Sequence, residues 1–405
     1  MPVHTSRRPP APKPGAPGRV PPILPPRAGP GNRGPGGAKR RAGRRDPLWA
    51  RLTLIFGAVL MMTSGVAIVG VKAIIGQATS SIDQGNLIGE AGKTRAEGGK
   101  NLKGPIDMLL LGVDARKTWA ADDVRSDTII ILHIPATHDQ AYLISIPRDT
   151  EAHIPPFEKS GYRGGVDKIN AAFQAGARNG GGWEGGAQLM AKTIKGMTGI
   201  GFDGAAIINF GGFKKIIDAL GTVRICVSHE VKSKHMSYVD GKPMWNSDAE
   251  KLGKPMTQVV HKKGCREMKG WEALDFARQR YGLPNADYDR QQNQQQLIKA
   301  MAKKATEKGM LTNPIKLNQL IKAAGESLIL DTGGVSIADF IFTLKGVTGN
   351  DVVTLRTNGG TYATNANNRE SLNDLSMRMF DAVKEDTLAD FVVANPAVLS
   401  TRKSA

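Results

Sequence analysis

Residues 125–149 read RSDTIIILHIPATHDQAYLISIPRD, and this stretch decides the fold. Two β-rich runs, Thr128–Ile134 and Ala141–Ile146, are separated by the turn-like segment Pro135–Gln140. Runs of this length and composition on either side of a turn predict a β-hairpin. The rest of the sheet is expected to build outward from these two strands.

Charged residues flank this hairpin at one end. Arg125 and Asp127 lead into its first strand, and Arg148 and Asp149 follow its second strand. Because the start of one antiparallel strand lies beside the end of its partner, we expect these four side chains at one edge of the sheet. Strand ends in α/β sheets are favoured places for ligands, although polar residues also simply terminate strands. Convergence of several such residues favours a site.

A third strand is predicted upstream of the hairpin. The apolar run Ile106–Val113 (IDMLLLGV) indicates a buried strand, and Asp114 follows it directly. Asp114 joins the same edge if this strand runs parallel to Ala141–Ile146. Mg²⁺ takes one or two protein carboxylates plus phosphate oxygens, and arginine forks bind phosphates bidentately. The predicted edge therefore has the composition needed around a pyrophosphate.

Two more arginines lie in residues 276–282, which read FARQRYG. Side chains two positions apart on a helix point to nearly opposite sides, so Arg278 and Arg280 face one ligand only if the chain is extended there. Gly282 and Pro284 favour a helix end nearby. A solvated basic stretch is the alternative interpretation.

The next segment is predicted to be a helix with an unusual polar face. Asp287 or Asp289 is expected to cap it, and Arg290 and Gln294 lie at i and i+4, on one face. The polar run at residues 290–296 (RQQNQQQ) is unusual for a helix that only packs against a core. A polar cavity lined by this helix would explain it.

Lys168 precedes an Ile-Asn-Ala-Ala-Phe segment and is either a further phosphate ligand or a surface residue. The seven histidines are scattered, and no His/Cys metal cluster, Gly-x-Ser-x-Gly motif or P-loop occurs in the sequence. Nucleophilic serine chemistry and P-loop nucleotide binding are therefore not indicated.

Further helices and strands are mixed without strict alternation, which predicts α/β layers around a mixed sheet. The expected helices cover Ala187–Met197, Phe213–Leu220, Trp271–Ala277, Arg290–Lys308, Pro314–Ala324 and Leu372–Lys384, and the expected strands cover Ala205–Asn209 and Thr222–Val227.

The N-terminal region differs in composition from the rest of the chain. Residues 1–47 are rich in Pro, Gly and Arg without apolar periodicity, which predicts a disordered tail. Residues 1–51 hold twelve Lys or Arg against one acid, so much of the net charge of +18 belongs to this tail. Binding of a specific nucleic acid is not expected from the charge alone.

Residues 52–71 (LTLIFGAVLMMTSGVAIVGV) contain no charge and are long enough to cross a bilayer as a helix. The arginines before them predict an uncleaved signal anchor with a cytoplasmic N-terminus and an extracellular catalytic domain. Residues 73–104 are then expected to form a polar stalk. Outside the cell no ATP is at hand, so an activated phosphate must arrive on the substrate itself.

The two cysteines, Cys226 and Cys265, are too few for a disulfide scaffold and badly spaced for a zinc site. A single disulfide is expected if they lie outside the cytosol. Two unpaired buried thiols are the alternative.

These motifs together resemble the LytR–CpsA–Psr (LCP) family of bacterial cell-envelope proteins. The resemblance runs from about Ile106 to Lys308, with a weaker extension to Lys384, and its motifs are LLLGVDAR, RSDTIIIL, ISIPRDT, DKINAAF, FGGFKKIIDALGTV, ARQRYG and DYDRQQNQQ. VDAR departs from the commoner serine-containing version, the loop Lys117–Val124 is short, and the separate C-terminal domain of some relatives is not evident. The cysteine pair and basic tail suggest an actinobacterial member, for which arabinogalactan is an expected polymer.

The resemblance implies a mixed central sheet flanked by helices on both faces and a phosphotransferase activity. The enzyme would join a glycopolymer carried on polyprenyl pyrophosphate to peptidoglycan, with Mg²⁺ (or Mn²⁺) as cofactor. Asp114 and Asp127 would be the metal ligands, and the pyrophosphate would be lined by Arg125, Arg148, Lys168, Arg278, Arg280, Arg290 and Gln294. The implied catalytic set is Asp114, Asp127, Arg148, Arg278 and Arg280.

The domain boundaries expected from this reading are a catalytic domain at residues 105–310, its C-terminal extension at 311–385 and a flexible tail at 386–405. A pyrophosphatase would use the same residues with water as the nucleophile. A non-catalytic lipid-carrier binding protein would keep the arginines without needing Asp114 and Asp127. An envelope-linked regulator is suggested only by the basic tail.

Overall fold

The computed structural model describes residues 83–94, 102–113, 124–310, 313–336, 339–340, 343 and 346–400. The predicted disordered tail, residues 1–47, and the predicted signal anchor, residues 52–71, lie outside these ranges, as does Asp114. No helix in the described part of the chain is both long and apolar enough to cross a membrane.

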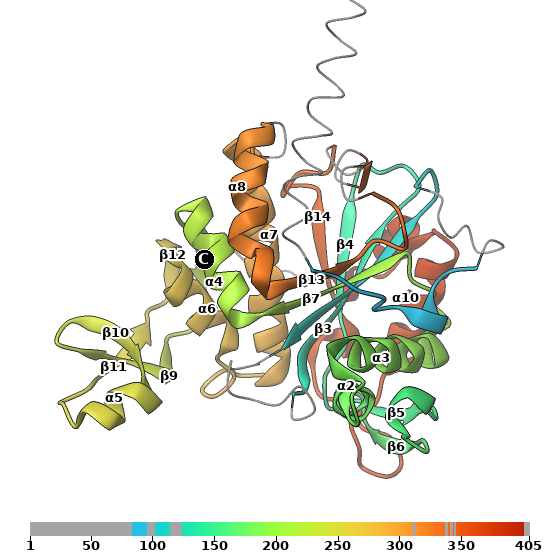
Figure 1. The fold of residues 1–405 in the computed structure, drawn as a ribbon, viewed down its shortest axis with the longest axis horizontal. Coiled ribbons are helices and arrows are strands. Elements are labelled where there is room, and N and C mark those ends of the chain that lie inside the picture. Colours follow the sequence, from blue (N-terminus) through green and yellow to red (C-terminus); the bar gives the residue numbers. More distant parts are fainter. Residues whose placement is uncertain are drawn as a thin grey trace, which may run out of the picture. The chain divides into compact units, whose positions relative to one another are not determined.

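A seven-stranded mixed sheet forms the centre of the fold (Figure 1). Its strands are, in spatial order, β1 (Asp83–Gln84), β13 (Leu328–Asp331), β7 (Gly204–Asn209), β2 (Ile106–Val113), β3 (Ser126–Ile134), β4 (Ala141–Ser145) and β14 (Val352–Arg356). The predicted hairpin is confirmed as the antiparallel pair β3–β4. Because β2 is antiparallel to β3, it runs parallel to β4, which is the condition set for Asp114 to join the edge.

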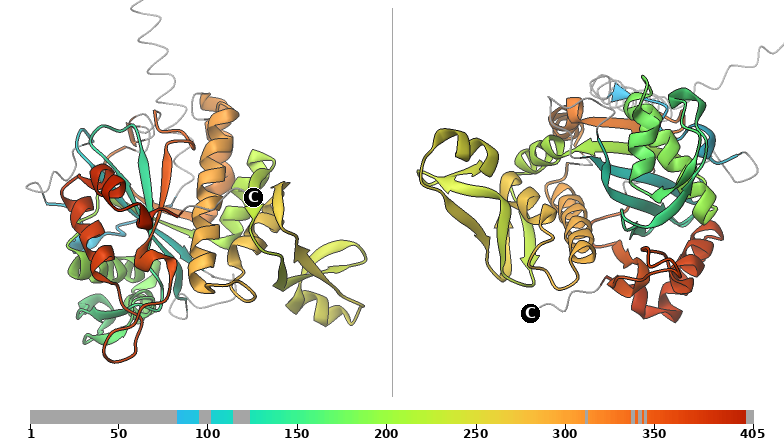
Figure 2. Two further views of the ribbon diagram at one scale, coloured as in Figure 1. Left: turned by 180° about the vertical axis from the view of Figure 1, so that it is seen from behind. Right: turned by 90° about the horizontal axis from the view of Figure 1, so that it is seen from below.

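Helices cover both faces of this sheet, which confirms the predicted layer order (Figure 2). Strand residues alternate between two apolar clusters, since Leu109 and Ile131 pack on one face and Met108 and Ile130 on the other. The first cluster includes residues of α2 (Ala171–Ala177), α3 (Gly182–Thr198), α10 (Asp374–Lys384) and α11 (Leu388–Ala394). The second includes Ile298 of α7 (Asp287–Glu307).

The other α-helices in the described residues are α4 (Phe210–Leu220), α5 (Asn246–Leu252), α6 (Gly270–Arg278) and α8 (Pro314–Ala324). The described part of the chain also forms three smaller sheets. They are β5 (Glu151–Ile154) with β6 (Gly165–Lys168), β8 (Val223–Val227) with β12 (Gly264–Met268), and β9 (Val231–Val239) between β10 (Lys242–Trp245) and β11 (Thr257–His261). We call residues 231–261, which contain β9, β10, α5 and β11, the arm.

Two segments pack more closely than their composition suggested. Residues 83–94, within the expected stalk, belong to the packed domain, because Leu87 and Ala91 are fully buried in its main cluster. Residues 386–400, expected as a flexible tail, include α11, whose Leu388 and Val392 lie one helical turn apart and face the same cluster.

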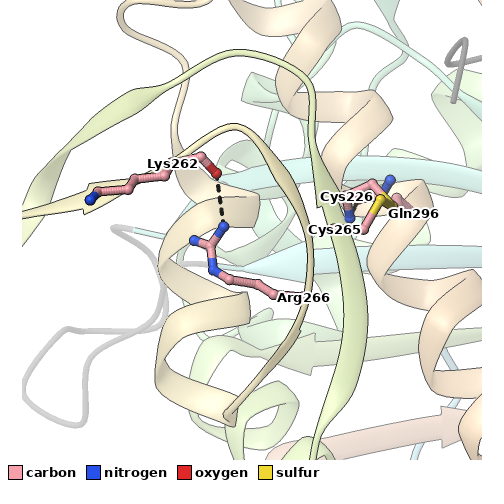
Figure 3. The surroundings of a disulfide bond; sticks show 5 residues. All are labelled: Cys226, Lys262, Cys265, Arg266 and Gln296. Atoms are coloured by element: carbon pink, nitrogen blue, oxygen red, sulfur yellow. Dashed lines mark hydrogen bonds between the residues drawn. A yellow bond between two sulfur atoms is a disulfide. The ribbon is translucent and has the colours of Figure 1, made fainter. Parts of the chain in front are cut away.

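The expected disulfide is confirmed. Cys226 of β8 and Cys265 of β12 are directly opposite each other in the antiparallel pair and are bonded, as Figure 3 shows. The backbone N–H of Cys226 donates to Oε1 of Gln296 on α7, 3.3 Å away. The disulfide therefore joins the strand that precedes the arm, β8, to the strand that follows it, β12.

Candidate active site

The predicted charged edge exists where β3 begins and β4 ends. Arg148, just after β4, donates from Nη1 to Oδ1 of Asp127 near the start of β3, at 2.5 Å. Nε of Arg148 lies 3.8 Å from Oδ1 of Asp287, the first residue of α7. Hairpin and helix thus meet at one arginine between two carboxylates.

Arg290 adds a second guanidinium to this cluster. It lies one turn after Asp287 on α7, and its Nη2 is 2.7 Å from Oδ1 of Asp287. The same Nη2 donates to the backbone carbonyl of Asp127 at 3.0 Å. Arg290 is 5% exposed, so its charge is largely removed from water. We call Asp127, Arg148, Asp287 and Arg290 the arginine cluster.

Burial and neighbouring charges act differently on the two arginines. Burial lowers the pKa of the Arg290 guanidinium, and the Arg148 charge adds to this, although Asp287 opposes it. Burial also acts to lower the pKa of Arg148, but the Asp127 and Asp287 carboxylates outweigh it and raise that pKa. Nε of each arginine is buried without a hydrogen-bond acceptor among the described residues. An anion with several oxygens would satisfy these donors.

The chain is extended between Arg278 and Arg280, which is the condition under which both side chains can face one ligand. Helix α6 ends at Arg278, and Gln279 is extended with φ −68° and ψ 134°. The Arg278 guanidinium lies 4.2 Å from the ring centroid of Phe210. Arg280 donates to the Tyr281 hydroxyl at 2.6 Å, and its charge is close enough to contribute to the lowered pKa of the buried Arg290.

A largely apolar pocket lies beside the arginine cluster. Thr128, the residue after Asp127, lines it together with Arg278 and Gln294. The other lining side chains are Phe210, Phe213, Leu274, Ala277, Leu297 and Ile298. Oε1 of the buried Gln294 has no donor among the described residues. The pocket thus presents polar groups at one part of its wall and hydrocarbon elsewhere.

The other two predicted ligands lie further out. Lys168 is exposed and pairs with Asp149, with Nζ 3.0 Å from Oδ1. The exposed Arg125 donates from Nε to Oε1 of Gln174 on α2 at 2.9 Å. No contact of either side chain with the arginine cluster is found among the described residues.

The expected capping of α7 is wrong. The N-cap residue is Ala286, which has no side-chain cap, and Asp287 and Asp289 lie in the first helical turn. Asp287 instead pairs with Arg290, which the sequence reasoning missed. Their spacing of three residues on a helix was the signal available.

A second group that the sequence did not predict joins Tyr288 of α7 to the C-terminal segment. The Tyr288 hydroxyl donates to Oε1 of Glu370 at 2.8 Å and accepts from Nδ2 of Asn358 at 2.9 Å. Burial raises the pKa of the Tyr288 hydroxyl and of the Glu370 carboxyl. Tyr288 lies 82 positions before Glu370 and 70 positions before Asn358, so no local sequence pattern connects it to either residue.

Comparison with known proteins identifies the class. The profile of the LytR_cpsA_psr family matches residues 73–385, and the chain therefore belongs to this family. The chain is 30% identical to the probable cell wall biosynthesis protein LcpB of Corynebacterium glutamicum over 54% of this chain and 46% of LcpB. It is 24% identical to LcpA of the same organism over 76% of this chain and 59% of LcpA. The chain thus spans about half the length of these relatives.

A third relative covers more of both proteins. It is the polyisoprenyl-teichoic acid–peptidoglycan teichoic acid transferase TagU of Enterococcus faecalis, 25% identical over 69% of this chain and 78% of TagU. Among solved structures, protein gbs0355 from Streptococcus agalactiae has a TM-score of 0.55 at 20% identity, covering 73% of this chain and 91% of that one. TagV from B. subtilis has a TM-score of 0.50 at 22% identity, covering 71% and 98%. These similarities establish the fold.

Proposed function

We propose that this chain is a phosphotransferase that moves a glycopolymer from a polyprenyl pyrophosphate carrier to peptidoglycan and releases polyprenyl phosphate. The observation that carries the proposal is the arginine cluster, in which Arg148 and Arg290 each keep a buried Nε without an acceptor among the described residues. Transferases for teichoic acid and peptidoglycan among the relatives support the substrate class.

In the proposed reaction an acceptor hydroxyl of peptidoglycan attacks the polymer-side phosphorus. A new O–P bond forms there, the bridging P–O bond breaks, and the electron pair leaves on polyprenyl phosphate. The hydroxyl proton is released as the bond forms. Arg148 and Arg290 hold the two phosphates in line and stabilise the charge that develops on the leaving group. Phosphoryl transfer needs mainly positioning and charge stabilisation, which guanidinium groups supply.

The apolar side chains around the pocket beside Arg278 are proposed to face the isoprenoid end of the carrier. The pocket itself has a volume of about 20 Å³, so it would have to open to admit an isoprenoid chain. A lipid pyrophosphate needs cationic groups next to a hydrocarbon surface, and Phe213 and Leu274 provide such a surface near Thr128. In this proposal Arg278 and Gln294 contact the phosphate end of the ligand.

Asp127 and the predicted second ligand, Asp114, are proposed to hold Mg²⁺ (or Mn²⁺). In the described part of the chain no three His, Cys, Asp or Glu side chains converge. Mg²⁺ usually takes one or two protein carboxylates and its other ligands from phosphate oxygens and water, a number that two aspartates would supply. When bound, the ion would supply additional neutralisation of phosphate charge. Asp127 meanwhile orients Arg148 through their hydrogen bond.

Residues 52–71 are proposed to anchor the protein in the cell membrane, with the catalytic domain outside. This location would place the site beside the bilayer that holds the lipid carrier. It also explains why the chain would use an activated lipid rather than a nucleotide.

The test compares Arg148→Ala with Arg224→Ala, an exposed arginine on β8, as the control. The full-length protein is incubated with a polyprenyl-pyrophosphate-linked oligosaccharide and a peptidoglycan fragment, and polymer attachment is followed. Arg148→Ala should lower attachment at least about a hundredfold, as expected for loss of a charge-stabilising donor, and Arg224→Ala should leave it unchanged. Equal attachment by both variants would overturn the proposal.

Asp127→Asn separates the enzyme from a binding protein. The isosteric amide should still bind the lipid pyrophosphate, but turnover should fail if Asp127 acts in the reaction. Unchanged attachment by Asp127→Asn would remove Asp127 from the catalytic set. Lipid pyrophosphate consumption that is independent of the peptidoglycan fragment would instead indicate the pyrophosphatase.

A further inference from the structure

Arg278 lies between two aromatic rings that come from different parts of the chain. Its guanidinium carbon is 4.2 Å from the ring centroid of Phe210 and 5.1 Å from that of Trp245. Phe210 begins α4 directly after β7, at the same sheet edge as the arginine cluster. Trp245 is the last residue of β10, in the arm. Both distances are within the range of cation–π attraction.

A hydrogen bond between a backbone N–H and a side chain joins the arm to the segment that carries Arg278. The N–H of Lys234 on β9 donates to Oε1 of Gln279, the residue after Arg278, at 3.0 Å. Nδ2 of Asn246, the residue after Trp245, donates to the carbonyl of Lys234 at 3.3 Å. Two hydrogen bonds thus connect the neighbours of the two side chains that form the cation–π contact.

A buried polar network fixes the arm against α6. The carboxylate of Asp275, which is fully buried, accepts from Oγ of Ser233 on β9 at 2.9 Å. Its other oxygen lies 2.7 Å from Nε2 of His261 on β11. Nε2 of Gln279 also donates to this carboxylate at 2.9 Å. Breaking such a network is costly, so the arm and the end of α6 hold one relative position.

The two strands that flank the arm in the sequence are also joined to each other. The Cys226–Cys265 disulfide joins β8 to β12, the strands that precede and follow the arm (Figure 3). Arg266 of β12 donates from Nη1 to the carbonyl of Lys262, which lies just before this strand, at 2.8 Å. The arm is therefore anchored at its base as well as along α6.

We propose that Trp245 is a positioning residue that, with Phe210, holds the Arg278 guanidinium toward the pyrophosphate site. The arm in this view completes the substrate site from outside the central sheet. The inference rests on the proposed function, because it assigns to Arg278 a pyrophosphate ligand. It goes further by giving the arm a part in substrate binding.

The test is the affinity of the full-length protein for farnesyl pyrophosphate, a short isoprenoid pyrophosphate. Trp245→Ala should raise Kd by about 2- to 25-fold, the equivalent of roughly 0.5–2 kcal/mol for a cation–π contact at 1.4 kcal/mol per tenfold. Trp245→Phe, which keeps an aromatic face, should recover most of the affinity. Met256→Ala, which removes an exposed apolar side chain of the arm, is the control and should bind as wild type.

A double-mutant cycle distinguishes positioning from general loosening of the fold. In an Arg278→Ala background, Trp245→Ala should cause no further loss, because the side chain that it positions is gone. The same fold-loss in both backgrounds would overturn the inference, as would wild-type affinity in Trp245→Ala. If Trp245→Ala does not fold, Trp245→Leu replaces it in the same cycle.

Failure of the proposed function gives a different result. A wild-type protein that does not bind farnesyl pyrophosphate would refute that function and the inference with it. Binding that depends on Arg278 but not on Trp245 would refute the inference alone.

Discussion

Neutralising Asp287 by Asp287→Asn is expected to destabilise the protein and to strengthen its binding of pyrophosphate. Asp287 contacts both arginines of the cluster, at 2.7 Å for Arg290 and 3.8 Å for Arg148. The Arg290 side chain is only 6% exposed, so loss of its carboxylate partner leaves a charge that water reaches poorly. Removal of one partner from a buried ion pair costs about 3–5 kcal/mol.

The expected loss of stability lies at or below the lower end of this range. The Asp287 side chain is 22% exposed, and Arg290 keeps its hydrogen bond to the carbonyl of Asp127. We therefore expect the free energy of unfolding to fall by about 2–3 kcal/mol, discounted for partial exposure. For a packed domain of this size that corresponds to a decrease in Tm of roughly 3–5 °C.

Pyrophosphate should restore part of this loss, because its oxygens replace the missing carboxylate. At saturating ligand, each tenfold gain in affinity adds about 1.4 kcal/mol of stability. Inorganic pyrophosphate at constant ionic strength should thus raise the Tm of Asp287→Asn by more than that of wild type. The assay is thermal unfolding of the full-length protein with and without this ligand.

Asp381→Asn is the matched control. Asp381 also pairs with a cation at i+3, with Oδ1 2.7 Å from Nζ of Lys384, but its side chain is 57% exposed. Loss of a surface pair of this kind changes stability by at most about 1 kcal/mol. The reasoning is refuted if the two variants lose equal stability, or if pyrophosphate raises the Tm of Asp287→Asn and wild type equally.

Three further predictions concern the scaffold. Lys93→Met should lower the free energy of unfolding, measured in urea, by about 3–5 kcal/mol. The reason is that Lys93 Nζ lies 2.8 Å from Asp107 and 2.7 Å from Asp203 in a buried cluster. A loss below about 1 kcal/mol would contradict this. Burial acts to lower the pKa of Lys93, but attraction to these two carboxylates outweighs burial and raises that pKa above 10.5. The contribution of the Lys93 charge to stability is therefore complete below pH 10.5 and is lost as the pH rises through the folded-state pKa. A loss of this contribution that is already finished at about pH 9 would argue against the assignment. Gly176→Ala should destabilise the protein by about 1–3 kcal/mol, since a Cβ there would lie 2.2 Å from the carbonyl oxygen of Gly185. Gly196→Ala, within α3 and with open space around the new Cβ, should instead stabilise the protein by up to about 1 kcal/mol. Calorimetry that shows the same sign for both substitutions would contradict the packing argument.

The hairpin and its charged edge were predictable because both depend on local pattern. Apolar runs on either side of a turn specify β3 and β4, and antiparallel pairing then brings Asp127 beside Arg148. The extended conformation of Gln279 was a stated requirement for Arg278 and Arg280, and the helix end near Gly282 favoured it. Periodicity and simple pairing geometry were sufficient for these features.

The arm was not predictable from the same pattern. Its strands β10 and β11 are short, and β9 alternates Lys232 and Lys234 with buried Val231 and Ser233. Lysine at alternate positions is as typical of a solvated segment as of a strand. Ser233 is buried because it donates to Asp275, 42 residues away, and no local signal marks such a partner.

Two side chains at or beside the predicted site could not be oriented from sequence. Arg125 lies at the expected edge, but its guanidinium hydrogen-bonds with Gln174 on α2, a helix placed by tertiary packing. Asp287 was read as a cap, although its charge pairs with Arg290 and Arg148. Side-chain direction at a strand end or first helical turn depends on neighbours that only the assembled fold supplies.

The central claim is tested most directly by identifying both products of one reaction. The full-length protein is incubated with a polyprenyl-pyrophosphate-linked oligosaccharide and a peptidoglycan fragment, and the products are analysed by mass spectrometry. The account predicts equal amounts of polyprenyl monophosphate and of a peptidoglycan fragment that carries the oligosaccharide through one phosphate. Free oligosaccharide phosphate with an unmodified peptidoglycan fragment, or an intact lipid pyrophosphate, would contradict it.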